Sequence, residues 1–253
     1  MIVLGILGAF AVDEYREAQH DRSVADEYLE QLVEDLVQDR NQIVTSEQRM
    51  REELLAADQI LTLLGAPVDR YWHEVPFYSA PSPGEIDRER IPIQALGEFE
   101  SFRPYSSTYG SMVSNGDLRT ITDPALRRTI VSYYEETERR QRDYAEFLRD
   151  AIRLKDLLLS HGVDVHGATD VGQVIEIDGL VPVLAAARDS SHWRLARLYL
   201  IKLHQQRLIN ALLGSDRLSP ESHSALRAVL YLTPESQERP QDLDWDSLVA
   251  PDP

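Results

Sequence analysis

The chain has 253 residues, a formal net charge of −17 and no cysteine. The absence of cysteine excludes disulfides, thiolate metal sites and cysteine nucleophiles. Acidic groups spread along the whole chain disfavour binding to nucleic acid or to anionic lipid headgroups. Hydrophobic residues make up 43% of the chain, which is enough for a sizeable buried core in one large or two small domains.

The chain opens with an apolar stretch, residues 1–12, that runs directly into an acidic helical pattern. Neither Gly nor Pro occurs between Ala9 and Leu64, so the residues that most often interrupt a helix are missing there. At about 1.5 Å per residue the apolar stretch is about 18 Å long, which is short of a hydrocarbon core of about 30 Å.

Three interpretations of residues 1–12 follow. The favoured one is a truncated transmembrane helix whose beginning lies further upstream. The second is a signal peptide cleaved near Ala11, where the sequence fits an A-x-A site but lacks a preceding basic region. The third is a buried N-terminal helix of a soluble protein. Gly5 and Ala9 form a small-xxx-small pair, which predicts close association of helices within a membrane.

From Asp13 the pattern becomes amphipathic and predicts one long helix over residues 13–64. Apolar residues recur along it every seven positions, at Leu29, Leu36, Ile43, Met50, Ala57 and Leu64. Such a stripe is a packing surface for neighbouring helices or a coiled coil. Arg40 and Glu47 interrupt a second apolar stripe, which favours an intramolecular bundle over a long isolated dimer.

A connection rich in proline follows over residues 65–104, and it carries a group of aromatic side chains. Connections of this length are usually functional or flexible. The aromatic residues are expected to cap one end of the bundle, and the alternative is a recognition surface. They are Tyr71, Trp72, Phe77 and Tyr78.

The middle of the chain contains clear helix boundaries. Ser106 or Ser107 can cap a short helix that Gly116 ends in the left-handed conformation. Asp123, followed by proline, is an N-cap that predicts a second long helix over residues 124–160.

The remainder of the chain is also predicted to be helical. Residues 180–188 fit a short helix, and a third long helix follows over residues 191–213. We expect Ser190 or Ser191 to cap it, and its nearly all-round apolar run predicts a central position in the core. Residues 233–253 form an acidic tail that contains proline.

These elements predict an all-α fold. A long N-terminal helix continues from the partial anchor, residues 1–12, into an antiparallel helix bundle over residues 13–232.

A search for catalytic motifs finds no phosphate-binding glycine loop, no G-x-S-x-G and no H-E-x-x-H. His161 and His166 flank a loop that contains Asp164, which suggests a metal site without a third ligand in register. We therefore predict no catalytic residue, no cofactor and no metal. A metal-assisted hydrolase that uses carboxylates and these histidines remains the alternative.

Two segments resemble a family of bacterial single-pass membrane proteins that carry an uncharacterised helical domain. The first is GILGAFAVDEY with YLEQLVEDLVQD, and the second is YGSMVSNGDLRTITDPALRRTIVSYY. The matching positions in the first are Gly5, Ile6, Leu7, Ala9, Asp13, Tyr28, Leu29, Leu32, Asp35, Leu36 and Asp39. Those in the second are Tyr109, Ser114, Gly116, Leu118, Ile121, Leu126, Tyr133 and Tyr134. Two departures are Tyr15, where the family usually has Trp, and the absence of the family's basic leader.

The resemblance implies a single-pass protein of the inner membrane with most of the chain in the periplasm, an orientation that follows the positive-inside rule. It implies no reaction. The resulting hypothesis is a membrane-anchored helical domain that acts in binding, assembly or sensing. Its expected partners are lipid along residues 1–12 and a second copy or a membrane protein, and not nucleic acid. The signature residues are expected to be structural: Asp35, Asp39, Tyr109, Gly116, Leu118, Asp123, Tyr133 and Tyr134.

Overall fold

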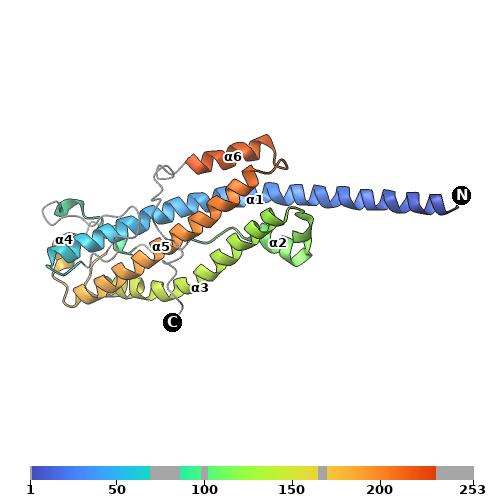
Figure 1. Cartoon of the computed structure of the whole chain (residues 1–253). Coiled ribbons are helices and arrows are strands. Elements are labelled where there is room, and N and C mark those ends of the chain that lie inside the picture. The colour runs from blue at the N-terminus through green and yellow to red at the C-terminus, as the bar shows by residue number, and fades with distance from the viewer. Residues whose placement is uncertain (1, 69–85, 98–101, 165–169, 232–253) are drawn as a thin grey trace.

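The computed structural model describes residues 2–68, 86–97, 102–164 and 170–231, and these residues form a helical bundle (Figure 1). No strand occurs among them, so the predicted all-α class is confirmed. The α-helices are α1 (Ile2–Leu63), α2 (Ser107–Asn115), α3 (Pro124–Ser160), α4 (Val171–Ile175), α5 (Leu180–Leu213) and α6 (Pro220–Tyr231). Short 3-10 helices are η3 (Arg88–Arg90), η4 (Ile93–Gly97) and η5 (Asp117–Thr120).

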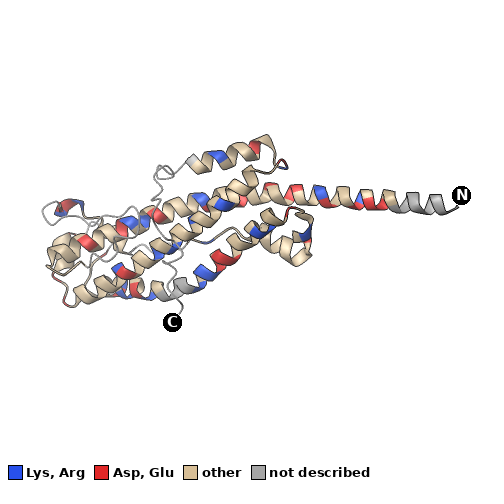
Figure 2. Ribbon diagram, in the orientation of Figure 1, with Lys and Arg blue, Asp and Glu red and all other residues tan. Residues whose placement is uncertain are grey.

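Helix α1 is one element of 62 residues, and its first part projects beyond the bundle (Figure 1). Residues 11–20 are all exposed, whereas Ala25 is fully buried. Figure 2 shows both acidic and basic side chains on the projecting segment past its first turns. From Ala25 onward the predicted stripe turns inward, and its buried members are Leu29, Leu36, Ile43, Met50 and Ala57.

The bundle is built from α1, α3 and α5, which lie side by side (Figure 1). Helix α5 runs antiparallel to α1, because Gln205 near its end contacts Leu36 whereas Arg188 near its start contacts Asp58. Helices α1 and α3 run parallel, because the connection after α1 returns the chain to the end of the bundle where α2 lies (Figure 1). Helix α5 is therefore antiparallel to both α1 and α3, as the predicted antiparallel bundle requires, whereas α1 and α3 are parallel to each other.

The apolar core has two parts along the bundle axis. One joins the middle of α1 to α2, the first half of α3, the second half of α5 and α6. The other joins the end of α1 to η4, the second half of α3, α4 and the first half of α5. Burial of apolar surface at about 25 cal/mol per Å² makes these two clusters the main source of stability.

The predicted boundaries of α2 and α3 have clear physical causes. Asp123 Oδ1 accepts hydrogen bonds from the N–H groups of Ala125 (2.7 Å) and Leu126 (3.3 Å), which confirms it as the N-cap of α3. Gly116 ends α2 with a φ of 75°, the left-handed conformation expected of it. Ser106 occupies the N-cap position of α2, but its side chain makes no capping hydrogen bond.

The predicted start of the third long helix is wrong. Helix α5 is continuous from Leu180, so the separate short helix over residues 180–188 does not exist and neither serine is a cap. Ser190 Oγ donates to Asp150 Oδ2 on α3 (2.8 Å), and Ser191 Oγ donates to the Ala187 carbonyl (2.8 Å). These hydroxyl groups find acceptors inside the bundle, so a serine pair that resembles a helix start is accommodated within a helix.

Candidate functional site

Five signature residues from three helices meet where the projecting segment of α1 enters the bundle. Asp35 and Asp39 lie one turn apart on α1, Tyr109 lies on α2, and Tyr133 and Tyr134 lie on α3. With Thr108 of α2 they form what we call the aspartate–tyrosine cluster. Of this group, only Tyr109 is not fully buried.

Asp39 is the centre of this cluster and is held by neutral hydrogen-bond donors. Tyr133 Oη donates to Asp39 Oδ2 (2.7 Å), and the backbone N–H of Tyr105 donates to Oδ1 (2.7 Å). Asp39 and Tyr133 are both 0% exposed. Burial raises the pKa of Asp39 from 3.8 to about 7, because the two donors offset only part of the desolvation cost. The nearby carboxylate of Asp35 acts in the same direction as burial.

The remaining members complete a packed aromatic wall. The rings of Tyr109 and Tyr134 stack with centroids 4.4 Å apart, and Tyr133 meets Tyr134 edge-on at 5.0 Å. Burial raises the pKa of Asp35, although Thr108 supplies hydrogen bonds that act in the opposite direction. The Tyr134 hydroxyl has no hydrogen-bond partner among the described residues. The cluster is therefore a rigid, buried acidic site that favours a bound proton.

A second set of buried carboxylates lies further along α1 and is held by cations of α5. The ion pairs join side chains that are 130 or more residues apart in sequence. They are Glu47 Oε2 with Lys202 Nζ (2.9 Å), Glu53 Oε2 with Arg194 Nη2 (2.5 Å) and Asp58 Oδ1 with Arg188 Nε (2.5 Å). We call this set the ion-pair ladder, and it fixes the register of α1 against α5.

The ladder explains the charges that interrupt the second apolar stripe of α1. Arg40 is 1% exposed and donates to Gln205 Oε1 (3.4 Å), and Glu47 pairs with Lys202. The nearly all-round apolar appearance of α5 concealed these buried polar positions. The only available signal was the order of charges, since acids along α1 meet bases in reverse order along α5, as an antiparallel pair requires.

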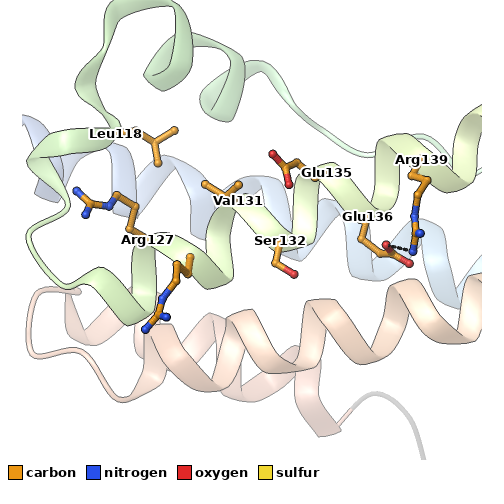
Figure 3. A pocket seen from close by; sticks show the side chains of 8 residues that line it. Leu118, Arg127, Val131, Ser132, Glu135, Glu136 and Arg139 are labelled. Carbon is orange, nitrogen blue, oxygen red and sulfur yellow. Dashed lines mark hydrogen bonds and ion pairs between the residues drawn. The ribbon is translucent and has the colours of Figure 1, made fainter. Parts of the chain in front are cut away.

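A groove lies outside the core, along the solvent side of α3 (Figure 3). It has a volume of about 580 Å³ and an apolar centre formed by the signature residue Leu118 and by Val131. Charged and polar side chains surround this centre: Arg127, Arg128, Ser132, Glu135, Glu136 and Arg139. We call it the arginine groove.

The groove continues into further basic side chains. Glu136 forms ion pairs with both Arg139 and Arg140, so its charge is already compensated. His204 and Arg207 of α5 lie near Glu136, and burial together with the neighbouring arginines lowers the pKa of His204. The groove itself is lined by three arginines and two glutamates, in a chain whose net charge is −17.

The other predicted sites fall partly outside the described residues. Outside them lie the aromatic group Tyr71, Trp72, Phe77 and Tyr78, the loop residue His166 and the tail 233–253. For Gly5 and Ala9, the structure describes only their place in helix α1. His161 Nδ1 lies 3.0 Å from the carbonyl oxygen of Leu157, at the end of its own helix. Within the described ranges, no three His, Asp or Glu side chains converge as metal ligands.

In the part of the chain that the structure describes, no helix combines the length and the apolar character needed to cross a membrane.

Comparison with known proteins identifies no relative. No protein-family model matches the chain, and no curated protein or solved structure matches it significantly.

Proposed function

We propose that this chain is a membrane-tethered helical domain that acts by binding or assembly, with its bundle in the periplasm. One observation carries the proposal. Residues 2–12 of the apolar stretch and the first bundle-forming residue, Ala25, belong to the same unbroken helix. An apolar end on a helix that is otherwise clamped into a folded domain is the arrangement expected of a tether. The periplasmic orientation rests on the family resemblance alone.

The geometry of α1 gives the tether a defined length. Residues 13–24 lie between the apolar lead and the bundle, and at about 1.5 Å per residue they form a spacer of about 18 Å. Residues 13–20 of this spacer are all exposed, including the large side chain of Tyr15 (65%), and so is Val12 (50%) just before it. The ion-pair ladder holds the other end of α1 against α5.

We place the proposed binding function on the solvent-exposed surface of the bundle. The buried carboxylates of α1 have partners within the bundle, whereas the arginine groove is accessible from solvent. A groove with an apolar centre and a charged rim is suited to recognition of another chain segment.

Fractionation of bacterial cells that express the native gene product tests the tether. We expect the protein in the carbonate-washed membrane pellet. Leu4→Asp combined with Leu7→Asp should move it to the soluble fraction, because each Asp costs about 2.5–3.5 kcal/mol at the centre of a membrane helix. The matched control, Ala18→Asp with His20→Asp, adds the same charge to the exposed spacer and should stay in the pellet. Recovery of the unaltered protein in the soluble fraction would refute the tether.

The orientation needs a separate measurement, and the chain is convenient for it because it has no cysteine. Ser160→Cys places one thiol at the exposed end of α3, far from the spacer. A membrane-impermeant maleimide should label it in intact spheroplasts. Labelling only after lysis would place the bundle in the cytoplasm.

A further inference from the structure

The arginine groove has a feature that a tether does not explain. Its lining combines the partly exposed apolar side chains of Leu118 and Val131 with three arginines, Arg127, Arg128 and Arg139. Figure 3 shows Arg127 at the same end as Leu118, and Arg139 at the other end beside Glu136. Glu135 and Glu136 also line the groove, and Glu136 is paired with Arg139, so the arginines exceed the glutamates by one. Apolar surface with an excess of positive charge is complementary to a segment in which apolar and acidic side chains alternate.

The sequence contains such a segment in its own C-terminal tail. Residues 241–249 read QDLDWDSLV, in which three aspartates alternate with Leu243 and Trp245. No basic residue follows Arg239. We propose that the arginine groove binds this segment of the same chain, with Trp245 or Leu243 over the apolar centre and the aspartates beside the arginines. This inference does not depend on the membrane tether.

The length of the tail permits this contact. Helix α6 ends at Tyr231, and Trp245 lies fourteen residues further along the chain. An extended chain spans at most about 3.3–3.6 Å per residue, so Trp245 can reach up to about 50 Å from the end of α6. Helix α5, with 34 residues, is about 51 Å long. The tail can therefore reach most positions on the bundle, including the start of α3.

The balance of forces favours binding within one chain. Exposed arginine–aspartate pairs are individually weak, so the contact needs the apolar contribution of Trp245 and the help of the covalent link. A short link gives an effective concentration on the order of millimolar, which is well above the concentration of a second copy in a dilute sample.

Disulfide trapping in the full chain tests the proposal directly, because no native cysteine interferes. Ser132 lines the groove, and Ser247 lies two residues after Trp245. On mild oxidation at low protein concentration, Ser132→Cys with Ser247→Cys should give an intramolecular disulfide. The matched pair, Ser160→Cys with Ser247→Cys, places the first thiol 28 residues along the same helix, about 42 Å away. We expect it to react about tenfold more slowly, because the docked tail is held away from it.

Charge variants in the Ser132→Cys, Ser247→Cys background separate docking from random collision. Asp242→Asn, Asp244→Asn and Asp246→Asn together should reduce the rate to that of the control pair. Arg128→Glu should also reduce it, whereas Arg153→Glu, at an exposed position of α3 remote from the groove, should not. Equal rates for the two cysteine pairs, or no effect of the aspartate changes, would overturn the proposal. A predominantly intermolecular disulfide would also overturn it, because the groove would then bind a second copy.

Discussion

The bundle buries carboxylates of α1 at two levels, and it holds them in different ways. In the aspartate–tyrosine cluster, a hydroxyl and a backbone N–H hold Asp39. In the ion-pair ladder, Lys202 and Arg51 hold Glu47. The pKa of Asp39 is raised to about 7 by burial. The pKa of Glu47 is lowered, because its two cations overcome the opposing effect of burial.

The comparison shows that neutral donors leave the pKa of the buried Asp39 raised, whereas Lys202 and Arg51 lower that of Glu47. At Glu53, burial outweighs the pairing with Arg194 and the pKa is raised. Neutral donors offset only part of the desolvation cost of a carboxylate, whereas a cation can reverse it. The ladder fixes the position of α1 against α5, and Glu47 has a lowered pKa within it. The cluster, at the end nearer the projecting segment, responds to protons near neutral pH. Four predictions test this difference.

The largest expected effect comes from removing one cation of the ladder. Arg194→Met should reduce the free energy of unfolding by about 3–5 kcal/mol, because Glu53 is 3% exposed and would lose its charged partner. Adding Glu53→Leu should recover most of that loss, since an apolar pair of similar volume often replaces a buried ion pair without cost. Urea denaturation measures both. A double variant as unstable as the single one would show that the pair does more than compensate charge.

The pH dependence of stability should differ in sign between the two levels. Asp39 has a raised pKa in the folded state, so its stabilising effect is complete below about pH 3.8 and is lost as the pH rises through about 7. Glu47 has a lowered pKa, so its effect is present above 4.5 and is lost as the pH falls below that value. Asp39→Asn should remove a decline in the free energy of unfolding between about pH 4 and pH 7. Glu47→Gln should instead weaken the loss of stability that occurs as the pH falls below about 4.5. Identical profiles for the two variants would contradict the comparison.

A smaller effect is expected from the tyrosine hydroxyls. Tyr133→Phe removes a donor from the buried Asp39 and should cost about 1–3 kcal/mol. Tyr134→Phe is the matched control in the same cluster, since that hydroxyl has no hydrogen-bond partner among the described residues. We expect the control to be neutral or slightly stabilising in thermal and urea denaturation. Equal losses would mean that ring packing matters and the Tyr133 hydrogen bond does not.

The smallest loss of stability is expected for an exposed carboxylate with neutral donors, and it serves as a reference for the buried ones. Asp123 is exposed and accepts from two backbone N–H groups as the N-cap of α3. Asp123→Ala should cost about 1 kcal/mol, and Asp123→Asn should cost less because the amide oxygen also caps. A cost for Asp123→Ala as large as that of Arg194→Met would show that burial is not what makes the ladder sensitive.

Much of the fold follows from local sequence patterns. The stripe from Leu29 to Ala57 is buried because a seven-residue repeat keeps one face of a helix toward its neighbours. Gly116 and Asp123 are identifiable because their roles depend only on adjacent backbone groups. The same local reasoning failed at Ser190 and Ser191, because their acceptors belong to the interior of the bundle.

The candidate site was predicted only in part. The signature positions identified most of the aspartate–tyrosine cluster, but nothing local showed that Asp39 contacts Tyr133, 94 residues away. The ladder was missed for the same reason, since the pairing of Asp58 with Arg188 spans 130 residues. Arg40 and Glu47 were correctly interpreted as disfavouring an isolated coiled coil. Their partners on α5 became apparent only with the packing of the bundle.

The most direct test is a carbon-13 NMR titration of the side-chain carboxyl of Asp39 in the full chain, with the carboxyl of Glu47 as the internal comparison. The account predicts an apparent pKa of about 7 for Asp39 and a value below 4.5 for Glu47. Asp39 titrating near its ordinary value of 3.8 would contradict the claim that neutral donors leave this buried acid protonated close to neutral pH.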